Sequence, residues 1–146
     1  MRYRRVEYPR HVPAAVEALR AAATAAHAGV LEPDLVDLVF LRVSQINGCA
    51  FCMDLHGAAL RRAGVDPRKL DTLPGWRHGH LFDARERAAL AWAEALTALP
   101  SRAPDEADYE ALKPHFDDAG IATLTMAVAV VNALNRLGVG LLPELP

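Results

Sequence analysis

The chain has 146 residues, of which 52% are hydrophobic and 23% are charged. This balance is typical of a soluble globular protein, and the length predicts a single domain over residues 1–146. The formal net charge of −2 at pH 7 gives no overall attraction to nucleic acid or to an anionic membrane, so we expect neither as a partner. The basic start, MRYRRVEYPRHVP, lacks the apolar stretch of a secretory signal, so we expect a cytoplasmic protein.

Apolar residues recur at helical spacing along nearly the whole chain, and no strand-like alternation of any length occurs. Proline, glycine and Asn-Gly signals divide this pattern into segments. We expect helices, in chain order, over residues 13–28, 33–46, 49–63, 67–73, 84–99, 105–112 and 118–138, with a loop over 73–82 and an extended tail from 139. The expected fold class is therefore all-α.

Local signals place several of these boundaries. Asn47-Gly48 predicts a turn after the second helix. Asp83, with Glu86 three residues later, predicts a capping box at the start of the fifth segment. Either Asp117 or the residue after it is expected to cap the last long helix.

The most apolar run is AGIATLTMAVAVVNAL, residues 119–134. It is short for a membrane span and is interrupted by Thr and Asn, so we expect a buried core helix. Because this helix is apolar nearly all round, we also expect a homo-oligomer with a subunit interface here. Asn132 and Asn135 need hydrogen-bond partners in such a helix, which predicts a structural or interface role, or a contact with the site.

Both cysteines of the chain lie in NGCAFCMDLH, residues 47–56. Cys52 follows Cys49 by three positions and His56 follows Cys52 by four, so the three side chains share one face of the helix that opens here. Cysteines at this spacing can close a disulfide with little backbone movement. A helix N-terminus favours the thiolate, and His56 can take a proton from Cys52. The pattern therefore predicts thiol redox chemistry.

Other interpretations stay open at this point. A zinc site would use the same residue types, but structural zinc takes four ligands, and His78 and His80 are the candidates to complete the set. His56 alone would be a buried histidine with a structural role. The order of the thiols is also open, because the helix dipole favours Cys49 as the thiol of lower pKa, whereas pairing with His56 favours Cys52.

The segment LVFLRVSQINGCAFCMDLH, residues 38–56, resembles the core signature of the AhpD-like alkylhydroperoxidases, within the carboxymuconolactone decarboxylase superfamily. Residues 75–97 and 115–137 are similar to later segments of that family, so the resemblance covers nearly the whole chain. It implies a compact all-α domain with the CxxC core at 37–64, assembled as a dimer, trimer or hexamer. It also implies reduction of hydroperoxides by the Cys pair, without a metal, flavin or other cofactor.

The resemblance maps the family's Cys pair onto Cys49 and Cys52 and its histidine onto His56, and it favours Cys52 as the peroxidatic thiol. The family's proton-relay glutamate falls on Asp37, which is one methylene shorter, roughly 1.5 Å of reach. Asp37 can act through a bridging water, lie too far away, or be a surface residue without function.

The expected function is therefore a thiol-dependent peroxidase. A hydroperoxide oxidises Cys52 to a sulfenic acid, Cys49 closes the disulfide, and a dithiol or protein reductant restores both thiols. One alternative is a lactone decarboxylase, although that branch does not need a CxxC pair. Another is a non-enzymatic redox sensor, because a relay weakened at Asp37 suits slow oxidation.

Overall fold

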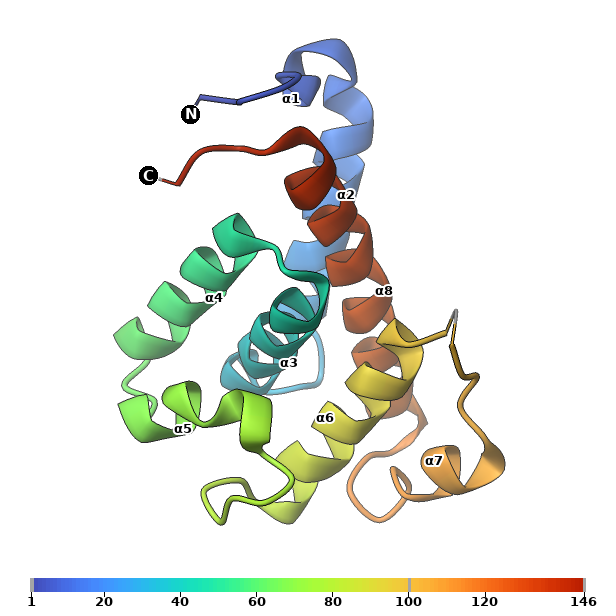
Figure 1. The fold of residues 1–146 in the computed structure, drawn as a ribbon. Coiled ribbons are helices and arrows are strands. Elements are labelled where there is room, and N and C mark those ends of the chain that lie inside the picture. Colours follow the sequence, from blue (N-terminus) through green and yellow to red (C-terminus); the bar gives the residue numbers. More distant parts are fainter. Residues whose placement is uncertain (1, 100, 146) are drawn as a thin grey trace.

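The computed structural model describes residues 2–99 and 101–145, and within them it is all-helical (Figure 1). The elements are α1 (Tyr8–His11), α2 (Pro13–His27), α3 (Pro33–Asn47), α4 (Ala50–Arg62), α5 (Pro67–Asp71), the 3-10 turn η1 (Leu73–Gly75), α6 (Ala84–Thr97), α7 (Glu106–Glu110) and α8 (Asp118–Leu141). The expectation of an all-α chain is thus confirmed for the described residues.

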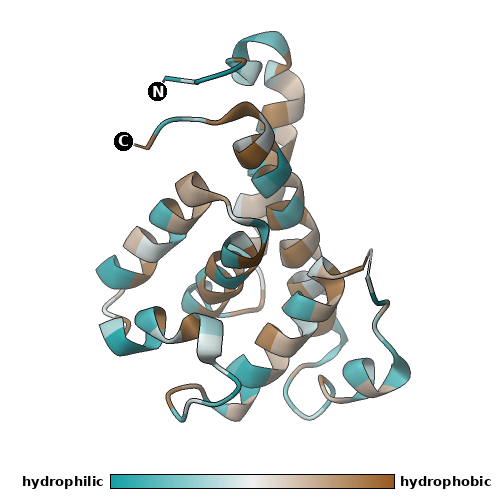
Figure 2. Ribbon diagram, in the orientation of Figure 1, coloured by the Kyte–Doolittle hydropathy of each residue, from teal (hydrophilic) through white to brown (hydrophobic). Residues whose placement is uncertain are grey.

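Helix α3 is the centre of the bundle. It packs against α2, α4, α6 and α8, while α8 in turn contacts α2, α4 and α6. Eight residues of α3 are buried, because apolar side chains occupy more than one of its faces. Figure 2 shows both hydrophobic and hydrophilic residues on each long helix, as expected for helices that bury one side against this centre.

The predicted boundary signals are found where expected. Gly48 ends α3 in the left-handed conformation, with φ 68°, which glycine adopts without strain. Asp83 and Glu86 form the complete capping box of α6. Asp117 caps α8, its side chain accepting a hydrogen bond from the backbone of Gly120.

Other boundaries were predicted wrongly. The short helix α1 was missed, and α8 continues to Leu141, three residues beyond the predicted end. The tail is therefore extended only after α8, where Pro143 forms an antiparallel bridge with Tyr3. The two ends of the described chain thus lie side by side (Figure 1). The predicted stop of α6 before residue 100 falls at Thr97, and residue 100 itself lies outside the described residues.

Helix α8 is long and apolar enough to cross a membrane by length and composition alone. A core helix of a soluble protein passes the same test, and α8 has eight buried residues and packs against four other helices. The arrangement agrees with the buried core helix expected from the sequence.

Candidate functional site

The turn between α3 and α4 places the two cysteines. After Gly48, Cys49 takes an extended conformation and becomes the N-cap of α4. Its sulfur accepts a hydrogen bond from the backbone N–H of Cys52 at 3.4 Å. Both cysteines are buried and unbridged. The predicted opening of a helix at Cys49 is confirmed, with Cys49 capping the helix instead of lying inside its first turn.

The pKa values of the two thiols are shifted in opposite directions. A hydrogen bond from the Cys52 side chain, opposed by burial, lowers the pKa of Cys49 from 9.0 to about 7, with smaller help from the Cys52 backbone N–H and the Asn135 amide. The same sulfur–sulfur hydrogen bond and then burial raise the pKa of Cys52. Above about pH 7 the pair therefore holds one proton, with Cys52 as the hydrogen-bond donor and Cys49 as the thiolate.

A network of polar side chains supports the thiols from behind. Asn135 of α8 is fully buried, and it donates to the hydroxyl of Ser44 at 3.0 Å. Asn47 donates to the amide oxygens of both Asn132 and Asn135 at 3.0 Å. Asn135 thus braces α3 against α8 and also contacts the cysteines, which combines two roles that the sequence left as alternatives. Asn47 likewise precedes the turn and bonds to α8.

Gly138 lets α8 approach the sulfur atoms. A methyl group at this position would lie 2.6 Å from the Cys49 sulfur and 3.6 Å from that of Cys52. Because the first distance is far inside van der Waals contact, any side chain here would displace the thiol. This close approach explains why a glycine lies within the helix instead of ending it.

His56 is held by a carboxylate of α3. Its Nδ1 lies 2.9 Å from Oδ1 of Asp37, so the shorter side chain reaches the imidazole without a bridging water. An ionised carboxylate only accepts hydrogen bonds, so Nδ1 carries the hydrogen and Nε2 is left to exchange a proton. No hydrogen bond joins His56 to Cys52 among the described residues, in contrast to the direct pairing that the sequence suggested.

A second histidine shares the same carboxylate. Nε2 of His27, from α2, lies 3.5 Å from Oδ1 of Asp37. The ring of Phe40 packs edge-on against both imidazoles, with centroid distances of 5.3 Å to His27 and 4.9 Å to His56. Asp37 is therefore the centre of a His–Asp–His arrangement. It is not an isolated surface residue.

These groups open onto a cavity of about 490 Å³, here called the thiol cavity. Its volume is in the range of small-molecule sites. Its polar lining residues are Tyr8, Arg20, Thr24, His27, Cys52 and His56. Most of the remaining wall is apolar and includes Phe40, Phe51, Leu55, Val131, Leu134 and Pro143. Cys49 does not line this cavity, so Cys52 is the thiol that a bound molecule would meet.

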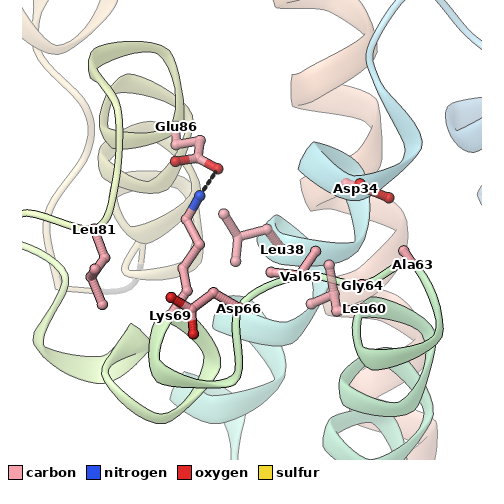
Figure 3. A pocket seen from close by; sticks show the side chains of 10 residues that line it. All are labelled: Asp34, Leu38, Leu60, Ala63, Gly64, Val65, Asp66, Lys69, Leu81 and Glu86. Atoms are coloured by element: carbon pink, nitrogen blue, oxygen red, sulfur yellow. Dashed lines mark hydrogen bonds and ion pairs between the residues drawn. The ribbon is translucent and has the colours of Figure 1, made fainter.

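A second cavity, of about 350 Å³, lies at the other end of α4 and is here called the Lys69 cavity. Figure 3 shows Lys69 reaching across it to form an ion pair with Glu86, while Asp34, Asp66 and Leu38 border it. It contains no cysteine or histidine.

The zinc alternative finds no ligand set in the structure. Among residues 2–99 and 101–145, no group of three or more His, Cys, Asp and Glu side chains is placed to hold a metal ion. His78 and His80 are exposed and do not line the thiol cavity.

A scan against family models matches residues 10–95 to the carboxymuconolactone decarboxylase family. The match spans more than half of the chain and includes both cysteines, His56 and Asp37. The chain belongs to this family.

Relatives of the family agree with the assignment. An uncharacterised protein of Bacillus subtilis, YdfG, is 34% identical over 106 residues, which is 72% of this chain and 71% of YdfG. A crystal structure from Agrobacterium tumefaciens, of a protein of unknown function assigned provisionally to the antioxidant defence protein AhpD, matches with a TM-score of 0.93 and 32% identity over 97% of both chains. A peroxidase-related protein with an AhpD core from Ralstonia eutropha matches with a TM-score of 0.81 and 26% identity, over 93% of this chain and 73% of that one.

The structure places Cys49 and Cys52 at the start of α4, directly after the turn from α3, and it joins His56 to the carboxylate of Asp37. Sequence reasoning missed His27, Tyr8 and Arg20. One signal for two of them was available: in the alanine-rich run of α2, Arg20, Thr24 and His27 recur at helical spacing and therefore share a face.

Proposed function

We propose that this protein is a thiol-dependent peroxidase that reduces organic hydroperoxides. The observation that carries the proposal is the thiol cavity, where Cys52 and His56 line a largely apolar space and a second thiol of low pKa lies directly behind Cys52. A family resemblance to AhpD-like proteins supports the same chemistry.

The two thiols have different roles, which follow from their positions and their pKa values. Cys52 lines the cavity and so acts as the peroxidatic thiol, even though its pKa is raised by the hydrogen bond to Cys49 and by burial. Cys49 is screened from the cavity, and its lowered pKa suits a thiolate that attacks a neighbouring oxidised sulfur. The raised pKa of Cys52 requires a base, and His56 supplies an imidazole four residues later on the same helix.

The first half-reaction oxidises Cys52. His56 takes the Cys52 proton on Nε2, and the thiolate attacks the terminal oxygen of the hydroperoxide. The O–O bond breaks, sulfur gives up two electrons to form a sulfenic acid, and the alkoxide takes the proton back from His56 to leave as an alcohol. Asp37 acts as a positioning residue, because it holds Nδ1 of His56 and stabilises the imidazolium that forms.

The second half-reaction forms the disulfide. The Cys49 thiolate attacks the Cys52 sulfur, the S–O bond breaks, and hydroxide leaves and is protonated to water. A dithiol partner then reduces the Cys49–Cys52 disulfide by exchange, which returns two electrons to the pair.

The test is hydroperoxide consumption by the purified protein with excess dithiol. Wild type is expected to turn over many times, and Cys52→Ser is expected to be inactive. When hydroperoxide is added before any dithiol, Cys49→Ser is expected to accumulate a sulfenic acid at Cys52, because the resolving thiol is missing. Lys69→Met, in the other cavity, is the matched control and is expected to keep full activity.

Two outcomes contradict the proposal. A sulfenic acid that forms in Cys52→Ser but not in Cys49→Ser would reverse the order of the thiols. A single round of disulfide formation without turnover in wild type would replace the peroxidase by a redox sensor.

A further inference from the structure

The polar part of the thiol cavity carries a positive charge at Arg20 and no carboxylate. Its lining contains one arginine and two histidines, and none of its lining residues is Asp or Glu. Asp37 lies behind the two imidazoles and is not part of the lining. An apolar space with an unopposed cation favours a ligand that is apolar along most of its length and anionic at one end.

Arg20 is the arginine on this lining, and its side chain has no partner among the described residues. In the described part of the chain, the arginines in ion pairs are Arg10, Arg42, Arg77, Arg85 and Arg102. Arg20 takes part in none of these pairs and in no side-chain hydrogen bond among the same residues. Its guanidinium is therefore available to a ligand, and the planar fork of donors suits a carboxylate.

Tyr8 adds a neutral donor beside Arg20. Burial and then the neighbouring Tyr3 raise the pKa of Tyr8, while Arg20 lowers it to a smaller extent. The phenol therefore keeps its hydrogen at neutral pH and can donate it to an anion. The other titratable groups on the lining are His27 of α2 and Cys52 and His56 of α4, whereas α3 and α8 contribute only uncharged residues to it.

The spacing along α2 sets the length of the ligand. Arg20 and His27 are seven residues apart on one face, which is roughly 10 Å along the helix axis. His27 marks the reactive end, because it shares Asp37 with His56. The two ends of the cavity are thus separated by about the length of a medium acyl chain.

We propose that the thiol cavity binds a medium-chain carboxylate, with the carboxylate at Arg20 and Tyr8 and the apolar chain along the wall toward Cys52. This inference rests on the proposed function for the identity of the substrate, which is then a carboxylic acid bearing a hydroperoxide near the far end of its chain. The carboxylate sets the orientation, and the peroxide reaches Cys52.

The first experiment measures binding without any hydroperoxide. Calorimetric titration of the reduced protein with octanoate and with octanol separates the contribution of the carboxylate from that of the chain. We expect octanoate to bind at least about tenfold more tightly than octanol, and Arg20→Gln to remove about tenfold of octanoate affinity. Arg62→Gln removes the same charge from an exposed site on α4 outside both cavities, and it is expected to change neither affinity.

Equal affinity for octanoate and octanol in wild type would overturn the proposal, as would an equal loss in Arg20→Gln and Arg62→Gln. Arg20→Lys is the second variant, and it is expected to keep part of the preference because the charge remains. A matching thermal unfolding midpoint for all variants verifies that each one folds.

The second experiment compares two hydroperoxides that differ only in a terminal carboxylate. We expect Arg20→Gln to lower kcat/KM about tenfold for the carboxylated one, through KM, and to leave the other unchanged. Octanoate binding with no reduction of either hydroperoxide would remove the proposed function and keep the carboxylate site. Reduction of both hydroperoxides at equal rates, with no preference for octanoate over octanol, would keep the proposed peroxidase function and remove the carboxylate site.

Discussion

The same two helices, α3 and α4, border two cavities with different chemistry. The thiol cavity lies beside Cys52 and His56 in the first two turns of α4, whereas the Lys69 cavity lies beside Leu60 at its end. Both are large enough for a small ligand. They differ in whether their polar groups are already paired with one another.

In the Lys69 cavity, three of the four charged side chains have structural partners, and Asp34 has none among the described residues. Lys69 pairs with Glu86 (Figure 3). The other carboxylate oxygen of Glu86 accepts from the backbone N–H of Asp83 to complete the capping box. Asp66 caps α5 by accepting from the backbone of Arg68. These interactions hold α5 and α6 in place and leave Asp34 as the unpaired charged side chain of this lining among the described residues.

In the thiol cavity, the structural partners lie behind the wall. Asp37 takes one nitrogen of His56, and Asn135 contacts the cysteines, while the reactive atoms face inward. A polar cavity is therefore not in itself a site. What distinguishes a site is side chains that are oriented by one partner and unsatisfied toward the cavity.

The largest expected effect separates the two cavities by activity. Cys52→Ser is expected to lower peroxide turnover by at least about 100-fold, because it removes the nucleophile. Lys69→Met, which breaks the ion pair in the other cavity, is expected to stay within about twofold of wild type. Hydroperoxide consumption with excess dithiol measures both. Comparable losses in the two variants would show that the cavities are not functionally distinct.

The next effect concerns the carboxylate behind His56. Asp37→Asn keeps the size of the side chain but removes its charge, so we expect turnover to fall roughly 10- to 100-fold. Asp37→Glu restores the family residue, yet the observed contact is already 2.9 Å, so we expect no gain and a modest loss from the extra methylene. An increase in turnover with Asp37→Glu would show that reach, and not charge, limits the relay.

A third test uses the packing of α8 on the thiols. Gly138→Ala is expected to destabilise the fold by roughly 1–3 kcal/mol, because its methyl group would overlap the Cys49 sulfur. Gly140→Ala is the matched control in the same helix, since nothing lies within 4 Å of a methyl group there. Denaturant unfolding of both variants measures the difference. Equal stabilities would mean that the helix adjusts without cost.

Helix boundaries could be predicted where the signal is local, and not where it depends on a tertiary contact. Pro33, Asn47-Gly48 and the Asp83–Glu86 pair are local signals, and each set a helix boundary correctly. Gly138 has the appearance of a helix stop, so α8 was predicted to end there. The glycine is instead required by the Cys49 sulfur, which lies nearly ninety positions away in sequence, and no local pattern carries that information.

The candidate site divides in the same way. The CxxC pair, the histidine one turn later and the aspartate on the preceding helix are close in sequence, and spacing together with resemblance found all four. His27 and Arg20 join the site only because α2 packs beside α3 and α8, which is a tertiary contact. The lowered pKa of Cys49 could not be predicted from the sequence either, because it depends on Cys52 and on Asn135 from α8.

That dependence predicts a pH effect. In wild type, the thiolate absorbance of Cys49 is expected to rise with pH and reach half its change at about pH 7, since its pKa is lowered to about 7. Asn135→Ala removes one of the groups that lower this pKa, so the midpoint is expected to move to higher pH, and less thiolate is present at pH 7. Cys49→Ser identifies the signal, because the step should vanish. A midpoint that does not move in Asn135→Ala would show that the amide is only structural.

The smallest effect tests the second imidazole on Asp37. His27→Ala is expected to lower kcat roughly threefold, because its contact at 3.5 Å is longer than that of His56 and adds to an arrangement that is already complete. His11→Ala, an exposed histidine on α1 that does not line the cavity, should have no effect. Free imidazole in the buffer can enter the space left in His27→Ala, so we expect it to restore kcat if His27 moves protons, and not if His27 only packs against Phe40. Restoration would extend the contrast between the cavities: a polar group of the thiol cavity would then work by exchanging protons, whereas Lys69 and Glu86 work by staying paired.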